Sequence, residues 1–98
     1  MSADLQFASD LSDALRVVLR EAREAAALSL GEVAARSGLN RQAITFIETG
    51  ERRPTTETLS RLTMALGLRP SEAWARAEAR IPAKEWKRQF QIMTTPKV

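Results

Sequence analysis

The chain of 98 residues contains no cysteine and no histidine. These absences exclude disulfides, thiolate nucleophiles and the two commonest zinc ligands. We therefore expect no metal and no cofactor. Hydroxyl side chains are plentiful, but no histidine base, phosphate-binding glycine loop or metal cluster accompanies them. The sequence does not predict an enzyme.

Tyrosine is also absent, and only 5% of the residues are aromatic. Strand signals are weak, because runs of β-branched residues are few and no alternation of apolar and polar residues is sustained over several positions. No apolar run approaches the roughly 20 residues of a membrane helix, and no signal peptide opens the chain. We expect a single all-α domain in the cytoplasm, associated with the nucleoid and not with a membrane.

Charge is distributed unevenly around a net value of +3. Residues 1–13 carry only the acidic Asp4, Asp10 and Asp13, whereas residues 80–98 carry Arg80, Lys84, Lys87, Arg88 and Lys97 against Glu85. A basic balance favours a polyanion such as nucleic acid, and a solvated surface is the alternative.

Apolar residues at helical spacing predict the first three helices. Ser9 or Ser12 is expected to cap the first helix, whose apolar stripe begins at Leu11. Ser29 and Glu32 form a capping-box pattern at the start of the second, which ends at Gly38. Asn40 caps the third, and Gly50 ends it.

The pattern in the second half of the chain predicts two more helices and a short amphipathic segment after them. Thr55 or Thr56 caps a fourth helix that Gly67 closes, and Pro70 opens a fifth. Pro82 interrupts the pattern before a short amphipathic sixth segment. The predicted organisation is a tail over residues 1–8, a domain over 9–81 and a basic amphipathic tail over 82–98.

The second and third predicted helices have the features of a helix-turn-helix. Such a motif needs a small residue where its helices touch, a glycine where the chain reverses, and a branched apolar residue anchoring the second helix. Ala34, Gly38 and Ile44 meet these needs in that order. An ordinary helix hairpin is the alternative interpretation of this trio.

A longer run of residues resembles the bacterial and phage Cro/repressor-type helix-turn-helix family, also called the xenobiotic-response-element family. It consists of Leu28-Ser29, Val33-Ala34, Ser37-Gly38-Leu39, Ile44, Ile47-Glu48, Gly50, Arg53-Pro54, and Leu59 through Leu66-Gly67-Leu68. The resemblance covers about Leu11 to Ala79. It implies a five-helix bundle of the lambda-repressor-like type that binds a palindromic operator in double-stranded DNA as a two-fold dimer.

The resemblance also implies a structural role for two charged residues. The family pairs an arginine late in its first helix with a glutamate near the end of its recognition helix, and these positions match Arg23 and Glu48. Repulsion of wrongly placed phosphates is an alternative role for Glu48. We favour a partly buried ion pair.

The third helix is the expected reader of base sequence in the major groove. Its N-terminal and outward side chains are Arg41, Gln42, Thr45 and Phe46, with Ala43 partly turned inward. Arg41 suits a guanine and Gln42 an adenine, because each offers two hydrogen bonds in the required geometry. For Phe46, where the family more often has a polar residue, we consider contact with a thymine methyl or with the adjacent loop.

Phosphate contacts are expected on both sides of this reader. The candidates are Ser29, Leu30, Asn40, Thr49, Arg52, Arg53 and Thr55, the first two through amides at a helix start. Leu30 departs from the family, which often carries a phosphate-binding glutamine at this place. That side-chain contact is therefore in doubt.

A dimer surface is expected in the C-terminal part of the chain. The candidates are Trp74 and Ile81 in the fifth helix and Trp86 and Phe90 after Pro82. Trp74 can equally be monomer core, and the charges near Trp86 can lie on DNA or on an acidic partner. A second function class is an antitoxin, whose tail binds a toxin while the same fold represses its own operon.

Overall fold

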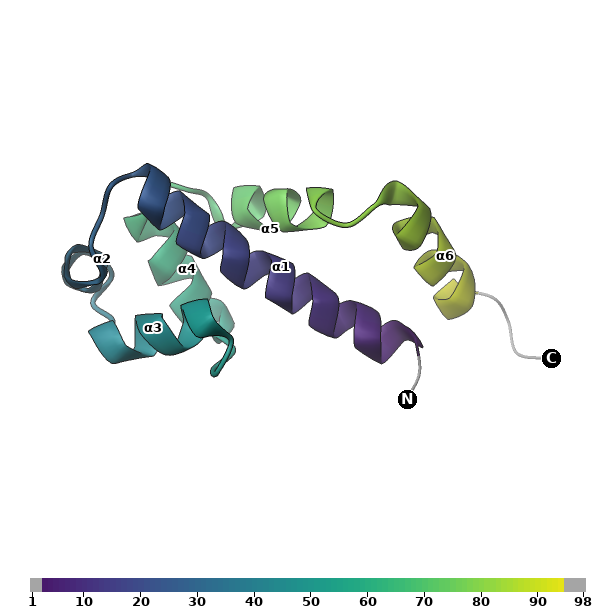
Figure 1. The fold of residues 1–98 in the computed structure, drawn as a ribbon, viewed down its shortest axis with the longest axis horizontal. Helices are drawn as coiled ribbons and strands as arrows, with labels where there is room; N and C mark the ends of the chain where they lie inside the picture. Colours follow the sequence, from purple (N-terminus) through teal and green to yellow (C-terminus); the bar gives the residue numbers. More distant parts are fainter. Residues whose placement is uncertain (1–2, 95–98) are drawn as a thin grey trace.

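The computed structural model describes residues 3–94 and consists, over that range, of α-helices joined by short turns (Figure 1). The helices are α1 (Ala3–Ala25), α2 (Leu30–Ser37), α3 (Arg41–Thr49), α4 (Thr56–Ala65), α5 (Pro70–Ala79) and α6 (Ala83–Thr94). None of these is long and apolar enough to cross a membrane. The all-helical prediction is confirmed. Residues 1–2 and 95–98 of the predicted tails lie outside the described range, and the domain boundaries stay a prediction.

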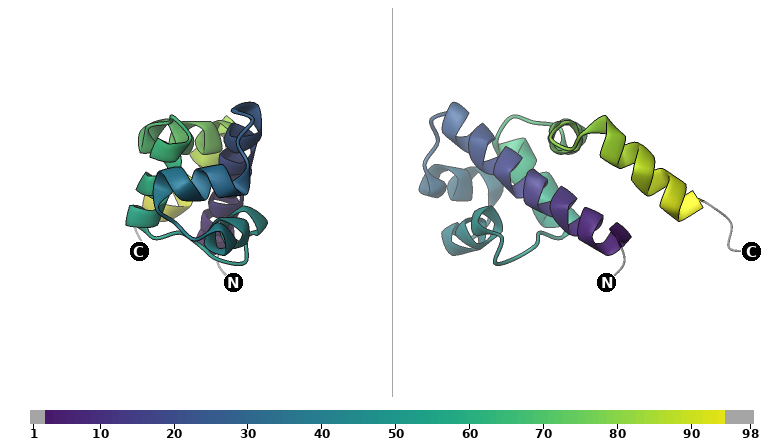
Figure 2. Two further views of the ribbon diagram at one scale, coloured as in Figure 1. Left: turned by 90° about the vertical axis from the view of Figure 1, so that its left-hand side faces the viewer. Right: turned by 45° about the vertical axis from the view of Figure 1, so that its right-hand side comes forward.

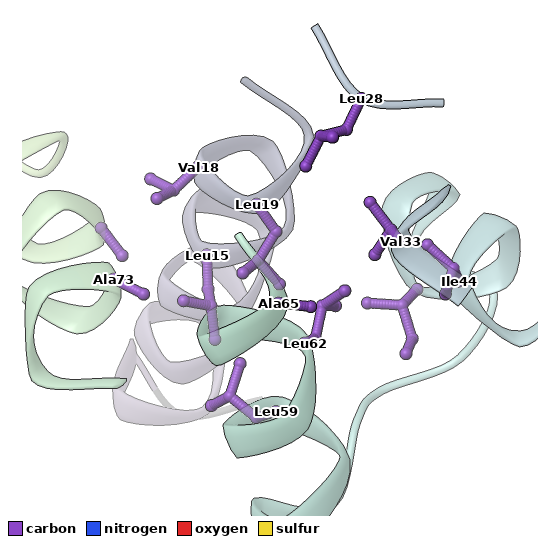
Figure 3. Close-up of a cluster of buried hydrophobic side chains, with 12 residues drawn as sticks. Leu15, Val18, Leu19, Leu28, Val33, Ile44, Leu59, Leu62, Ala65 and Ala73 are labelled. Carbon is purple, nitrogen blue, oxygen red and sulfur yellow. The ribbon is translucent and has the colours of Figure 1, made fainter. Parts of the chain in front are cut away.

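The core forms where α1 and α4 meet the pair α2 and α3 (Figure 3). Leu19 and Leu62 are 1% exposed, and Val33 and Ile44 are fully buried. Burial of each such side chain stabilises the fold by about 1.5–3 kcal/mol. Ala73 and Ala77 of α5 complete the cluster from the far side of α1. The core therefore fixes α3 against three other helices.

The first helix begins earlier than the sequence analysis predicted. Neither Ser9 nor Ser12 caps it, because α1 starts at Ala3 and both serines lie inside the helix. The reason is that the apolar stripe extends one turn further back than Leu11, to the buried Phe7. Most of the predicted N-terminal tail is thus helical.

The molecule is elongated, with extents of 53 × 22 × 19 Å. Helices α2, α3 and α4 gather at one end, and α6 lies at the other beside the N-terminal part of α1 (Figures 1 and 2). The Phe7 and Trp86 rings meet edge to face with centroids 4.7 Å apart, and Trp86 Nε1 donates to the Glu78 carbonyl at 3.2 Å. These contacts hold α6 on the body of the monomer.

Two helices end in the same hydrogen-bonded turn with different residues at its centre. After α1, Leu28 N donates to Arg23 O and Ala27 N to Glu24 O; after α4, Leu68 N donates to Thr63 O and Gly67 N to Met64 O. The central residue is left-handed in both, with φ 56° for Ala27 and 76° for Gly67. Only at Ala27 does a Cβ carry the steric cost of that conformation.

Ala27→Gly is therefore expected to raise the free energy of unfolding by about 0.5–1 kcal/mol, after the added flexibility of glycine in the unfolded chain is counted. Urea unfolding followed by circular dichroism measures the change. Gly67→Ala is the matched control and should lower stability by a similar amount, because alanine is strained at φ 76° while the added Cβ meets no atom within 4 Å beyond the neighbouring residues. A less stable Ala27→Gly variant would contradict this account.

Candidate nucleic-acid interface

Helices α2 and α3 form the two arms of the helix-turn-helix, and polar caps fix their ends. Ser29 Oγ accepts from Glu32 N at 3.1 Å while Glu32 Oε1 accepts from Ser29 N at 3.2 Å, which is the expected capping box. Asn40 Oδ1 accepts from Gln42 N at 2.7 Å. The three-residue turn Gly38–Asn40 joins the helices.

The three residues assigned to the motif scaffold lie at the contact between its arms. Gly38 adopts φ 72° and its N–H donates to Ala34 O, so the chain reverses immediately after α2. Ala34 packs half-buried against the core, where Ile44 is fully buried. Ile44 and Ile47 therefore hold the inner face of α3 while its other face is left to solvent.

Arg23 and Glu48 form a bidentate ion pair between α1 and the end of α3. Arg23 Nε lies 2.7 Å from Glu48 Oε2 and Nη2 lies 2.9 Å from Oε1. Their side chains are 16% and 9% exposed. Hydrogen bonding to this carboxylate, opposed in part by burial, raises the pKa of Arg23 above its ordinary value. Arg23 Nη1 also donates to Leu28 O at 3.1 Å, so one guanidinium links α1, the following turn and α3.

Arg16 is a second anchor for α3 that sequence reasoning missed. Its Nη1 donates to the Glu48 carbonyl at 3.3 Å, satisfying one of the last acceptors of the helix. Its side chain passes over Gly50, where an added Cβ would come within 2.9 Å of Arg16 Nε. No local pattern announces a contact between residues 32 apart. Glycine is therefore needed at position 50 for two reasons: the backbone is left-handed there, with φ 84°, and a side chain would clash with Arg16.

The outer face of α3 presents the predicted reading residues. Arg41 and Gln42 are exposed at its first turn, and Thr45 is half-buried with Oγ1 donating to Arg41 O at 3.3 Å. Within residues 3–94 the Arg41 guanidinium and the Gln42 side-chain amide have no protein partner. Ala43 is half-buried, as expected. The Arg41 and Gln42 side chains can therefore offer all their donors to a ligand.

Phe46 contacts the loop that follows α3. The Arg52 guanidinium carbon lies 5.2 Å from the Phe46 ring centroid, and Arg52 N donates to Phe46 O at 3.0 Å. This is the contact with the adjacent loop that the sequence analysis considered, and contact with a thymine methyl stays a prediction. Phe46 thereby positions a cation beside the end of α3.

The start of α2 is less available to a phosphate than the sequence indicated. The Ser29 amide is taken by Glu32, and this hydrogen bond, with the nearby Ser29 hydroxyl, lowers the pKa of the Glu32 carboxyl. The amides of Leu30 and Gly31 are the ones that stay free at the first turn. The Leu30 side chain packs against the core, which gives a physical reason for leucine at this position.

The other candidate phosphate ligands surround the end of α3. Thr49 Oγ1 donates to Phe46 O at 3.2 Å, and Thr55 caps α4 by accepting from Thr58 N at 3.1 Å. Asn40 is engaged as a cap at the other end. Arg52 and Arg53 are exposed, and Arg53 Nη2 reaches Ser9 Oγ at 3.4 Å. Two arginines thus stand beside the reader.

The dimer candidates separate into two groups. Ile81, Trp86 and Phe90 line a groove of about 570 Å³ between α5 and α6. Phe90 and Met93 extend this apolar surface along one face of α6, with exposures of 58% and 64%, while Ile92, 47% exposed, lies on another face of the helix. Trp74, 37% exposed, lines a different cavity beside the 50–54 loop. An apolar surface of this kind commonly marks an interaction site.

Comparisons with known proteins agree with this geometry. The family model described as Helix-turn-helix, HTH_3, matches residues 19–72. A crystal structure of the clp gene regulator ClgR from C. glutamicum has a TM-score of 0.67 and 25% identity, covering 74% of this chain and 95% of that chain. A second ClgR structure, from Corynebacterium glutamicum, has a TM-score of 0.67 and 21% identity, covering 88% and 96%. No curated protein is significantly similar to the sequence.

The matched segment begins in the C-terminal part of α1 and ends in the first turn of α5, so it contains the whole reading unit and the Arg23–Glu48 pair. The family is one of DNA-binding regulators of transcription. The chain therefore belongs to the HTH_3 family of Cro/C1-type helix-turn-helix proteins.

Proposed function

We propose that this protein is a dimeric, sequence-specific regulator that inserts α3 into the major groove of a palindromic operator and acts as a repressor or autoregulator. The observation that carries the proposal is the contrast between the faces of α3. Its inner face is fixed by Ile44, Ile47 and the Arg23–Glu48 pair, while Arg41 and Gln42 stand exposed at its N-terminal turn. A rigid helix with unengaged donors at that turn suits base reading.

Phosphate contacts would fix the register of this helix on the duplex. Arg52, Arg53 and Thr49 lie at one end of the reader, with Thr55 at the start of α4 behind them. The free amides of Leu30 and Gly31 lie at the start of α2, with Asn40 at the turn. Such contacts contribute affinity without sequence preference.

A second subunit is needed because one recognition helix covers only a few base pairs. We place the dimer contact on the α5–α6 groove and the exposed face of Phe90 and Met93. Trp74 is set apart from this surface, and Trp86 already packs on Phe7 within the monomer. The apolar surface of α6 and the requirement for two readers support one self-complementary interface.

Arg41→Ala tests the groove assignment. It should cost about 1–3 kcal/mol on the best site and relax preference at one base pair, whereas Arg53→Ala should weaken all sequences similarly and flatten the salt dependence. Selection of bound duplexes from random DNA supplies the site, and fluorescence anisotropy at several salt concentrations supplies the affinities. Unchanged binding by Arg41→Ala would refute the assignment.

As a chromosomal regulator the protein would act in the cytoplasm, on the nucleoid. The antitoxin alternative predicts a stable complex with one defined protein as well as operator binding. Purification of the tagged chain from its own host, followed by mass spectrometry, distinguishes the two. A stoichiometric partner with toxic activity would favour the antitoxin, and recovery of the homodimer alone would favour the simple regulator.

A further inference from the structure

A cavity of about 280 Å³ opens beside the loop that follows the recognition helix. Five segments enclose it: α1, the end of α3, the 50–54 loop, α4 and α5. Its floor is apolar, formed by Leu15, Leu19, Ile47 and Leu59, which belong to the core. The Trp74 indole forms one wall. The size is close to the lower end of the range for small-molecule sites.

The rim of the cavity is strongly basic. The lining residues include three arginines, Arg16, Arg52 and Arg53, and a single acidic residue, Asp13. Two of these arginines each have one long contact at the rim: Arg53 Nη2 is 3.4 Å from Ser9 Oγ, and Arg16, whose Nη1 donates to Glu48 O, has its Nε 3.4 Å from Asp13 Oδ1. These distances lie beyond those of good hydrogen bonds. A ligand carboxylate at 2.7–2.9 Å would replace them with stronger, charge-assisted contacts.

From this combination we infer a binding site for a small amphipathic acid with one ring or branched apolar body and one carboxylate. The body would lie on the leucine and isoleucine floor beside Trp74, and the carboxylate would face the guanidinium groups at the rim. A neutral analogue would gain the apolar contact alone. A cation would be repelled by the three arginines.

Occupation of this cavity would act on DNA binding, and this part of the inference rests on the proposed function. Arg52 and Arg53 line the cavity and are also our candidate phosphate ligands. A bound carboxylate would neutralise part of their charge, so the complex with DNA should weaken and depend less steeply on salt. The protein would thereby sense an acid without a separate ligand domain.

Benzoate and its neutral analogue benzamide test the site in the full chain. Each is titrated while amide and indole N–H resonances are followed by two-dimensional NMR. Trp74 reports on the cavity, and Trp86 is an internal control because it does not line the cavity and its indole N–H is held by Glu78 O. Benzoate should shift the Trp74 signal saturably with a dissociation constant below about 1 mM, leave Trp86 unchanged, and bind at least about tenfold more tightly than benzamide.

Arg53→Gln should weaken benzoate binding and leave benzamide binding unchanged, whereas Arg69→Gln, an exposed arginine that does not line the cavity, should change neither. An unsaturated Trp74 response, equal binding of the two probes, or no effect of Arg53→Gln would overturn the inference. DNA binding is measured without benzoate. If DNA binds and Trp74 does not respond, the ligand site alone fails; if Trp74 responds and no DNA binds, the proposed function alone fails.

Discussion

Glu48→Ala is expected to lower the free energy of unfolding by about 3–5 kcal/mol, because it leaves the Arg23 guanidinium in a largely buried position without its carboxylate. This is a large share of the roughly 5–15 kcal/mol that stabilises a typical domain. Urea unfolding monitored by circular dichroism measures it. The loss in operator affinity, measured where the variant is still folded, should be smaller, since the carboxylate faces α1 and not the DNA.

Two further variants test whether the expected loss of stability comes from leaving a buried charge unpaired. Glu24→Ala removes an exposed partner of Arg20, in a pair at 3.0 Å with side chains 62% and 53% exposed, and should change stability by less than about 0.5 kcal/mol. The double variant Arg23→Met, Glu48→Leu should recover most of the loss, because it leaves no unpaired buried charge. A loss below about 1 kcal/mol for Glu48→Ala would mean that water reaches the pair.

Replacing both Phe90 and Met93 with serine is expected to convert the proposed dimer to monomers and to weaken operator binding by about 100-fold or more. The reason is that two readers on one duplex bind together only while they are joined. Both side chains are more than half exposed, so their removal takes little from the monomer core. Sedimentation equilibrium measures the mass, and fluorescence anisotropy measures the affinity.

Met64→Ser is the matched control for this surface. Met64 is 70% exposed, on α4 and away from the α5–α6 groove, so its removal tests the general effect of losing an exposed apolar side chain. It should leave both mass and affinity unchanged. If the Phe90 and Met93 double variant still sediments as a dimer, the interface lies elsewhere on the molecule.

Local interactions explain why the sequence predicted the motif so well. The cap at Ser29 with Glu32, the cap at Asn40 and the turn at Gly38 each involve residues two to four positions apart, so the pattern itself encodes the contact. The inner face of α3 follows from helical periodicity. These features placed α2 and α3 without knowledge of the rest of the fold.

Long-range contacts explain what could not be predicted. Arg16 reaches Glu48 O and Arg53 reaches Ser9 across 32 and 44 residues, and the cavity beside Trp74 depends on five segments meeting. Phe7, in the part of α1 that the sequence did not predict, packs on Trp86, which lies far along the chain. For Phe46 the residue type alone left its partner open, since both a thymine methyl and Arg52 suit an aromatic ring.

Helix α1 connects the two functional ends of the molecule. It is tied to α3 through Arg23 and Arg16 and to α6 through Phe7, and its 23 residues span about 34 Å. In a dimer joined at α6, the two copies of α1 would set a fixed distance between the two recognition helices. Half a helical turn of DNA added between the two halves of the operator would carry one half-site to the opposite side of the duplex. The dimer would then be unable to bind both half-sites together.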